Sequence, residues 1–282
     1  MRPIRVTAVR YFNTLPLIEG LDRLEDLELS TAAPSHIAGM LASGDADIGL
    51  VSLVDAVRSA TPFTVLPVGM IGCEGPTLTV RIYSAVEPER ITTLHADTDS
   101  HTSVLLARLL LEHRYGVRPR IVDFDARERV TRTHGETDQS EWPESLLMIG
   151  NKVVTDSPPA VRYPHQLDLG EQWHTWTSRP FVYAAWMCRS EDLEDESADR
   201  SAAIRMAATL LDRQRRHNET RLDWIVTERA AEHRWPADLA RTYLGDLLRF
   251  DMGEREREAS AHFLSLCAQS GYLPEATLRF GS

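Results

Sequence analysis

The sequence has few of the features that mark most specialised protein classes. It contains only 3 cysteines among 282 residues. Because Cys73, Cys188 and Cys267 lie far apart and share no CxxC spacing, a disulfide framework and a zinc site are both disfavoured. No apolar run approaches the roughly 18 residues of a membrane-spanning helix. The formal net charge of −11 argues against nucleic acid and against an anionic membrane surface as partners.

Familiar catalytic and cofactor motifs are missing as well. The 10 histidines form no HExxH or other ligand spacing, and the chain holds no P-loop, GxGxxG turn or GxSxG elbow. The sequence therefore predicts neither a metal nor a cofactor. The first ten residues contain no apolar stretch like that of a secretory signal, and the cysteines indicate a reducing compartment. We therefore expect a cytoplasmic protein.

The first two thirds of the chain alternate between short β-rich runs and helical segments. This alternation predicts an α/β fold of mixed, mostly parallel sheets covered by helices, followed by a helical C-terminal part without strands from Asp195 onward. The polar stretch 127–141 predicts a surface loop. Helices are expected at residues 34–43 and 100–115, and strands at residues 4–9, 27–31, 47–52, 63–71, 77–84, 91–95, 120–124, 146–149 and 181–187.

Two such cycles followed by a helical tail predict two lobes. The chain is expected to cross between them near residues 79–87 and 177–187. That gives a discontinuous first lobe of residues 1–86 and 185–282 and an inserted second lobe of residues 87–184. Ligands of open α/β sheets bind beyond the carboxyl ends of the strands, so we expect a ligand cleft between the lobes.

The start of the strongest helix is the first candidate contact for a ligand. Residues 99–103 read Asp-Ser-His-Thr-Ser and follow a predicted strand. Free N–H groups and the helix dipole attract an anion there, and Ser100, Thr102 and Ser103 add hydroxyl donors. Ordinary helix capping is the alternative, and it is the commoner role of such residues.

Further polar residues also fall near the ends of predicted strands. Asn13 follows the first strand, and it either presents its amide to a ligand or makes a local turn. Ser52 and Asp55 follow the third strand, where capping is their default role. Thr77 and Thr79 share one face of a strand, which lines a cleft or forms an exposed edge.

An aromatic cluster surrounds the second expected crossing between the lobes. Arg179 lies in it, where it either holds a carboxylate or makes a surface cation–π contact. Tyr183 and Trp186 follow on the next strand, where packing in the core or hinge is their simpler role.

Taken together, these segments resemble the chorismate dehydratase family of the futalosine route to menaquinone. The resemblance covers nearly the whole chain. It rests on the Tyr-Phe-Asn-Thr-Leu-Pro turn at 11–16, the Ser-His-Thr-Ser helix start at 100–103 and the Pro-Phe-Val-Tyr-Ala-Ala-Trp strand at 180–186. The resemblance implies the two-lobed fold of type II periplasmic binding proteins. It also implies dehydration of chorismate, a small dianion, to 3-[(1-carboxyvinyl)oxy]benzoate without a cofactor.

The resemblance also implies roles for individual residues. Asn13 would lie beside the reacting ring, and Thr79 would hydrogen-bond the departing hydroxyl or the ether oxygen. These two form the expected catalytic pair. The expected substrate-binding residues are Ser52, Ser100, Thr102, Ser103, Asn151, Arg179 and Tyr183.

Four positions depart from the family pattern. Thr79 replaces a serine and Asp55 a glutamate, whereas Asn151 replaces an aspartate and Arg179 a leucine. The last two changes make the expected cleft less negative, which suits an anionic ligand. Two other functions stay open from the sequence: a two-lobed small-anion binding protein without catalysis, and the related dihydroxynaphthoate synthase of the same route.

Overall fold

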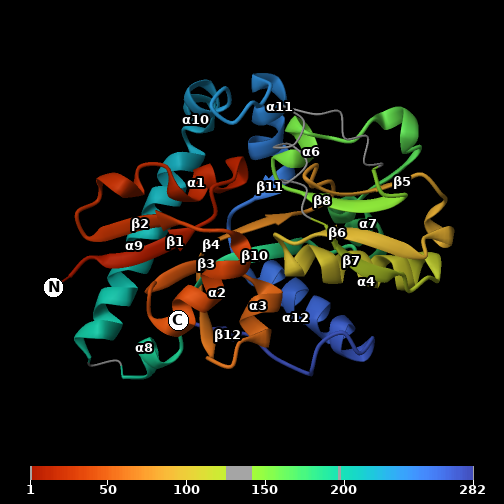
Figure 1. Cartoon of the computed structure of the whole chain (residues 1–282). Coiled ribbons are helices and arrows are strands. Elements are labelled where there is room, and N and C mark those ends of the chain that lie inside the picture. The colour runs from red at the N-terminus through yellow and green to blue at the C-terminus, as the bar shows by residue number, and fades with distance from the viewer. Residues whose placement is uncertain (1, 125–141, 196–197, 282) are drawn as a thin grey trace.

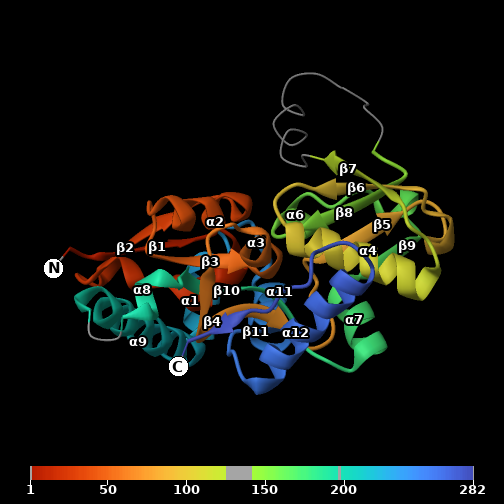
Figure 2. The ribbon, with the colours of Figure 1, turned by 90° about the horizontal axis from the view of Figure 1, so that it is seen from below.

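The computed structural model describes residues 2–124, 142–195 and 198–281, so the loop predicted at 127–141 lies outside the described residues. The strands gather into two separate sheets, and helices surround both of them (Figures 1 and 2). We call the part built on the larger sheet the first lobe and the part built on the smaller sheet the second lobe. This two-lobed α/β fold agrees with the prediction.

The larger sheet joins segments from both ends of the chain. Its order is β11-β4-β10-β3-β1-β2, with β12 pairing to β4. Strand β1 is parallel to β2 and β3, whereas β10 is antiparallel to β3 and β4. Its strands are β1 (Ile4–Ala8), β2 (Leu27–Thr31), β3 (Ile48–Ser52), β4 (Phe63–Cys73), β10 (Phe181–Arg189), β11 (Leu248–Arg249) and β12 (Arg279–Phe280).

The smaller sheet uses the middle of the chain. Its order is β7-β6-β8-β5-β9, in which β6 is parallel to β7 and β8, and β5 is antiparallel to β8 and β9. Every residue of β8 is buried, as expected for a strand covered on both faces. The strands are β5 (Val80–Ser84), β6 (Thr93–Asp97), β7 (Arg120–Phe124), β8 (Ser145–Ile149) and β9 (His165–Asp168).

Helices cover the sheets and fill the C-terminal third. The longest, α9, packs against α1, β4 and β1, whereas α12 packs against β10 and α4. The helices are α1 (Leu15–Ile18), α2 (Pro34–Ser43), α3 (Leu53–Arg58), α4 (His101–Tyr115), α6 (Lys152–Thr155), α7 (Leu169–Thr177), α8 (Glu191–Glu194), α9 (Asp199–Glu219), α10 (Leu222–Arg229), α11 (Ala237–Thr242) and α12 (Glu254–Gln269). Short 3₁₀ turns occupy Phe12–Thr14, Leu21–Arg23, Pro88–Arg90 and Ala160–Arg162, and a π-helical turn occupies Tyr243–Leu247.

Local sequence explains the helix α4 that borders the cleft. Ser100 is its N-cap and accepts a hydrogen bond from the backbone N–H of Ser103 at 3.2 Å. Gly116 ends the helix with φ of +70°, a left-handed conformation that suits glycine. The buried face of α4 contributes leucines to the core of the second lobe, which fixes the first turn of α4 against the sheet.

The two segments that cross between the sheets are tied together by Asp168. Its buried carboxylate accepts the N–H groups of Thr77 and Leu78 at 2.9 and 2.7 Å, and also those of Gly170 and Glu171 at 3.1 and 3.2 Å. Leu78 is held at φ of +63°, an uncommon conformation for leucine. The strand ends on both crossings are therefore fixed by one side chain.

Three details of the fold differ from the expectations. Both sheets are mixed, but parallel pairings are no more frequent than antiparallel ones among the described strands. The C-terminal part contains β11 and β12, which have two residues each and are too short to show an alternating pattern. Strand β9 was not predicted, because its sequence His-Gln-Leu-Asp contains one aliphatic residue.

The crossings also lie earlier than expected. Strand β5 was assigned to the first lobe, but it pairs within the smaller sheet. By sheet membership the chain leaves the first lobe between residues 73 and 80, and it returns between residues 168 and 181. Strand β5 lies between β8 and β9 and pairs with both, so both of its edges are hydrogen-bonded within the smaller sheet.

Candidate active site

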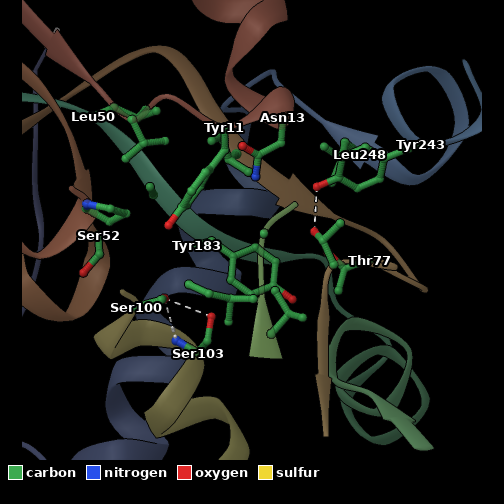
Figure 3. A pocket seen from close by; sticks show the side chains of 18 residues that line it. Tyr11, Asn13, Leu50, Ser52, Thr77, Ser100, Ser103, Tyr183, Tyr243 and Leu248 are labelled. Atoms are coloured by element: carbon green, nitrogen blue, oxygen red, sulfur yellow. Dashed lines mark hydrogen bonds between the residues drawn. The ribbon is translucent and has the colours of Figure 1, made fainter. Parts of the chain in front are cut away.

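A cleft opens between the two lobes, and residues from both sheets line it (Figure 3). Its volume is about 630 Å³ when the open space at its mouth is counted. Six of the nine site residues expected from the sequence line it: Asn13, Ser52, Thr79, Ser100, Ser103 and Tyr183.

The first turn of α4 forms one wall of the cleft. Ser100 Oγ accepts the Ser103 N–H and donates its proton to Ser103 Oγ at 2.9 Å. The dashed lines in Figure 3 mark these two bonds. Because Ser103 Oγ accepts the hydroxyl proton of Ser100, the Ser103 hydroxyl can donate its own proton to another acceptor. The N–H groups at the start of a helix have no acceptor within the helix, and Ser100 and Ser103 bring the start of α4 to the cleft lining.

The facing wall is assembled from distant parts of the chain. Asn13 lies in the 3₁₀ turn after β1, and Thr79 lies just before β5. Tyr243 joins them from the C-terminal part, and its hydroxyl lies 2.6 Å from Thr79 Oγ1. Figure 3 shows Asn13 and Tyr243 on the side of the cleft opposite Ser100 and Ser103.

The described lining of the cleft carries no formal charge. Tyrosines are the only titratable side chains among the described residues that line it, namely Tyr11, Tyr183 and Tyr243. Burial raises the pKa of Tyr183 and of Tyr243 well above the usual value for a phenol, so both stay protonated near neutral pH. The Tyr183 hydroxyl is buried next to the side chains of Thr77 and Cys73.

Ser52 connects the cleft to a polar contact between α3 and α4. It caps α3 and donates to Asp55 Oδ2 at 2.8 Å. The other oxygen of Asp55 lies 2.5 Å from Nδ1 of His101, the first residue of α4. The hydrogen bond to Asp55 raises the pKa of His101, and desolvation opposes that rise. This pair therefore joins the two lobes next to the ligand site.

A second link between the lobes contains a buried lysine. Lys152 Nζ lies 2.5 Å from Asp97 Oδ2 and 2.9 Å from Asp99 Oδ2. The Tyr11 hydroxyl donates to Asp99 at 2.7 Å from the opposite lobe. Burial raises the pKa of Asp97, although Lys152 acts in the other direction. Lys152 thus pairs with both carboxylates, and the bond to Asp99 holds the Tyr11 side chain at the cleft.

Three expected site residues do not line the cleft. Thr102 is fully buried, and its hydroxyl accepts the Val54 N–H at 3.2 Å. Asn151 accepts the Phe12 N–H at 3.2 Å and so supports the turn that carries Asn13. Arg179 is exposed and lies 3.6 Å from Glu258.

The sequence reading missed Tyr243, which completes the wall containing Asn13 and Thr79. A π-helical turn begins at Tyr243, and such turns are frequent at functional sites, but a single sequence does not show one. Tyr11 was noted only as part of a turn, and its hydroxyl lies at the cleft because Asp99 accepts its proton.

The described residues contain neither a cluster of metal ligands nor a membrane-spanning helix. No group of three or more metal-ligating side chains occurs within the described ranges. None of the helices in those ranges is both long enough and apolar enough to cross a membrane.

The fold belongs to the class of periplasmic-binding-protein-like folds. The alkanesulfonate-binding protein of Xanthomonas axonopodis pv. citri, solved with MOPS bound, has a TM-score of 0.65 and 12% identity, over 99% of this chain and 96% of that chain. The aliphatic sulphonate-binding protein of Escherichia coli has a TM-score of 0.62 and 11% identity, over 98% of this chain and 95% of that chain.

Sequence comparison gives the family within this class. The chain belongs to the menaquinone biosynthesis family, whose model matches residues 4–269. Chorismate dehydratase from Thermus thermophilus is 28% identical over 206 residues, which are 68% of this chain and 72% of that protein. The family expected from the sequence motifs is thereby confirmed.

Proposed function

We propose that the protein is a carbon–oxygen lyase that removes water from chorismate, giving 3-[(1-carboxyvinyl)oxy]benzoate in the futalosine route to menaquinone. Its family and its likeness to a chorismate dehydratase support this function. The observation that carries the proposal is the uncharged cleft, in which the first turn of α4 faces Asn13 and Thr79.

A dianion can bind in this cleft without a lysine or arginine in the lining. The backbone N–H groups of His101 and Thr102 belong to the first turn of a 15-residue helix, where they lack intrahelical acceptors and lie at the positive end of the helix dipole. Ser103 adds a hydroxyl donor beside them. We assign one carboxylate of chorismate to this turn, because helix N-termini bind anions through these same groups.

Once the carboxylate is bound, the dehydration depends mainly on how the ring is positioned in the cleft. Loss of one ring proton and the ring hydroxyl makes one water molecule, and aromatisation of the ring drives the reaction. Asn13 would lie beside the ring, and Thr79 would donate a hydrogen bond to the departing hydroxyl. Because the described lining contains no carboxylate, imidazole or amine, we propose that a carboxylate of the substrate accepts the ring proton.

A small-anion binding protein without catalysis is the second candidate. The structural likeness to two sulfonate-binding proteins favours it, and so does the lack of an acid or base in the described cleft lining. Both candidates use the same helix N-terminus for the anion. They differ in whether Asn13 and Thr79 act on the ring.

The cysteines support a location in the cytoplasm, which we propose together with the activity. All three cysteines are free and buried. Burial raises the pKa of each thiol to about 12, so none is a reactive thiolate, and the arrangement suits a reducing compartment.

Incubation of the purified protein with chorismate tests the proposal directly. We expect the aromatic product to accumulate, measured by liquid chromatography against the heat-denatured protein. Calorimetric titration with chorismate separates the candidates, because binding without product would favour the binding protein. If chorismate were neither converted nor bound, the proposed dehydration would be wrong.

A further inference from the structure

The contact between Tyr243 and Thr79 carries an inference that rests on the proposed dehydration. We propose that Tyr243 is a positioning residue, whose hydroxyl takes up an acceptor site on Thr79 and so directs the Thr79 proton towards the ligand. Thr79 would then donate to the departing hydroxyl in a fixed direction.

The two hydroxyls form a close pair that is shielded from water. Tyr243 Oη and Thr79 Oγ1 are 2.6 Å apart, and the two residues are only 1% and 2% exposed. Both residues line the cleft. The backbone of Thr79 is fixed as well, because its N–H donates to Thr77 O at 2.7 Å and its carbonyl accepts the Gly150 N–H at 2.8 Å.

In the proposed arrangement, Tyr243 is the donor of the pair. A buried phenol has one proton to donate, and its oxygen can also accept. Asn13 lines the same wall of the cleft as Tyr243, and its amide nitrogen is a donor that the proposal directs to the phenol oxygen. If Asn13 donates to the phenol oxygen, Tyr243 donates its own proton to Thr79. Thr79 then has its proton free for the ligand.

Stacked rings hold the phenol in this position. Tyr243 stacks on Trp235 with a centroid distance of 4.8 Å, and Trp235 stacks on Phe12 at 5.0 Å. Phe12 precedes Asn13 in the same 3₁₀ turn. The stack therefore connects the turn carrying Asn13 to the π-helical turn that begins at Tyr243, and it restricts rotation of the phenol away from Thr79.

The test is the kinetics of Tyr243→Phe with chorismate, compared with Tyr163→Phe. Tyr163 is a matched control, because it is also fully buried and donates one hydrogen bond, to Pro143 O at 2.6 Å, outside the cleft lining. For Tyr243→Phe we expect kcat to fall roughly 10- to 100-fold with KM within about 3-fold. For Tyr163→Phe we expect a similar loss of thermal stability with an unchanged kcat.

A double-mutant cycle separates positioning from direct action. If Tyr243 acts through Thr79, adding Tyr243→Phe to Thr79→Val causes little further loss, because the hydroxyl that it directs is already gone. Full additivity of the two losses, or wild-type kcat in Tyr243→Phe, would overturn the inference while leaving the proposed function intact. If the unsubstituted protein fails to convert chorismate, the proposed function fails first, and this role fails with it.

Discussion

The two walls of the cleft both present a directed hydroxyl, but they are built differently. In the α4 wall, Ser100 donates to Ser103, only three residues away. In the facing wall, the hydroxyl of Thr79 is paired with that of Tyr243, which is 164 residues away. The first wall follows from the capping of one helix. The second exists only when the turn after β1, the crossing before β5 and the C-terminal part have come together.

This difference indicates that the two walls have different roles, one in binding the anion and the other in orienting the reacting group. A helix N-terminus is a general anion site. The facing wall supplies an amide and a hydroxyl with defined directions, which is what an oriented reaction needs. We therefore expect substitutions in the facing wall to lower kcat, and substitutions in the α4 wall to raise KM.

The largest expected effect is that of Asn13→Ala. We expect kcat to fall on the order of 100- to 1000-fold, as for other positioned polar groups beside a reacting centre. Binding of chorismate, measured by calorimetry, should change much less. The comparison variant is Asn151→Ala, which removes the acceptor for the Phe12 N–H and the contact with His233 Nδ1 and should lower kcat less than about 10-fold. Equal losses of kcat in the two variants would contradict the proposal that Asn13 contacts the substrate whereas Asn151 only supports the turn that carries Asn13.

Ser103→Ala tests the α4 wall. Losing one hydroxyl donor to a carboxylate should raise KM by roughly 10-fold, with kcat within about 3-fold. Thr102→Val is the matched control on the same turn, because its hydroxyl accepts the Val54 N–H and does not reach the cleft. We expect this control to lower thermal stability and to leave KM unchanged. A larger rise in KM for Thr102→Val than for Ser103→Ala would show that the carboxylate does not bind beside the Ser103 hydroxyl.

A smaller effect is expected from the His101–Asp55 contact between the lobes. The hydrogen bond to Asp55 raises the pKa of His101, whereas desolvation and Arg58 lower it and Asp123 adds to the rise. A histidine with a raised folded pKa stabilises the fold fully below its unfolded value of about 6.5, and this contribution is lost as pH rises through the folded pKa.

The pH dependence of thermal unfolding measures this contribution. The deficit of His101→Gln relative to the unsubstituted protein should be largest near about pH 5.5 and should shrink towards about pH 8.5. His101 is partly exposed, so solvent screening keeps the difference small. A deficit that grows as the pH rises would contradict the ion pair.

The smallest effect is expected for Arg179→Ala. Arg179 lies at the surface 3.6 Å from Glu258, and both side chains are exposed. We therefore expect kcat/KM to stay within about 2-fold of the unsubstituted value, because exposed ion pairs contribute little. A strong rise in KM would restore the sequence-based prediction that Arg179 binds the substrate.

Some of the site residues could be predicted from the sequence, and others could not. The start of α4 could be read from residues 100–103 alone, since capping is a local interaction. The error at Thr102 is one of geometry. At about 100° per residue, Ser103 lies close to the face of Ser100, whereas Thr102 is turned to the opposite side. Helical spacing alone thus assigns Thr102 to the core.

The errors at Arg179, Asn151 and Tyr243 have a different origin. Ser178 ends α7 in a left-handed conformation with φ of +56°, and the Arg179 side chain beyond this turn pairs with α12. Asn151 contacts a backbone group of the other lobe. Both outcomes depend on packing between elements that are far apart in sequence. The role of Tyr243 depends in the same way on the return of the C-terminal part to the cleft.

A crystal structure of the Asn13→Ala variant with chorismate bound would test the central claim most directly. The account predicts a carboxylate of the ligand against the backbone N–H groups of His101 and Thr102 and the Ser103 hydroxyl, with the ring hydroxyl within hydrogen-bond distance of Thr79. A ligand whose carboxylates contacted Arg179 or Lys152 instead, with the first turn of α4 left without an anion, would contradict it.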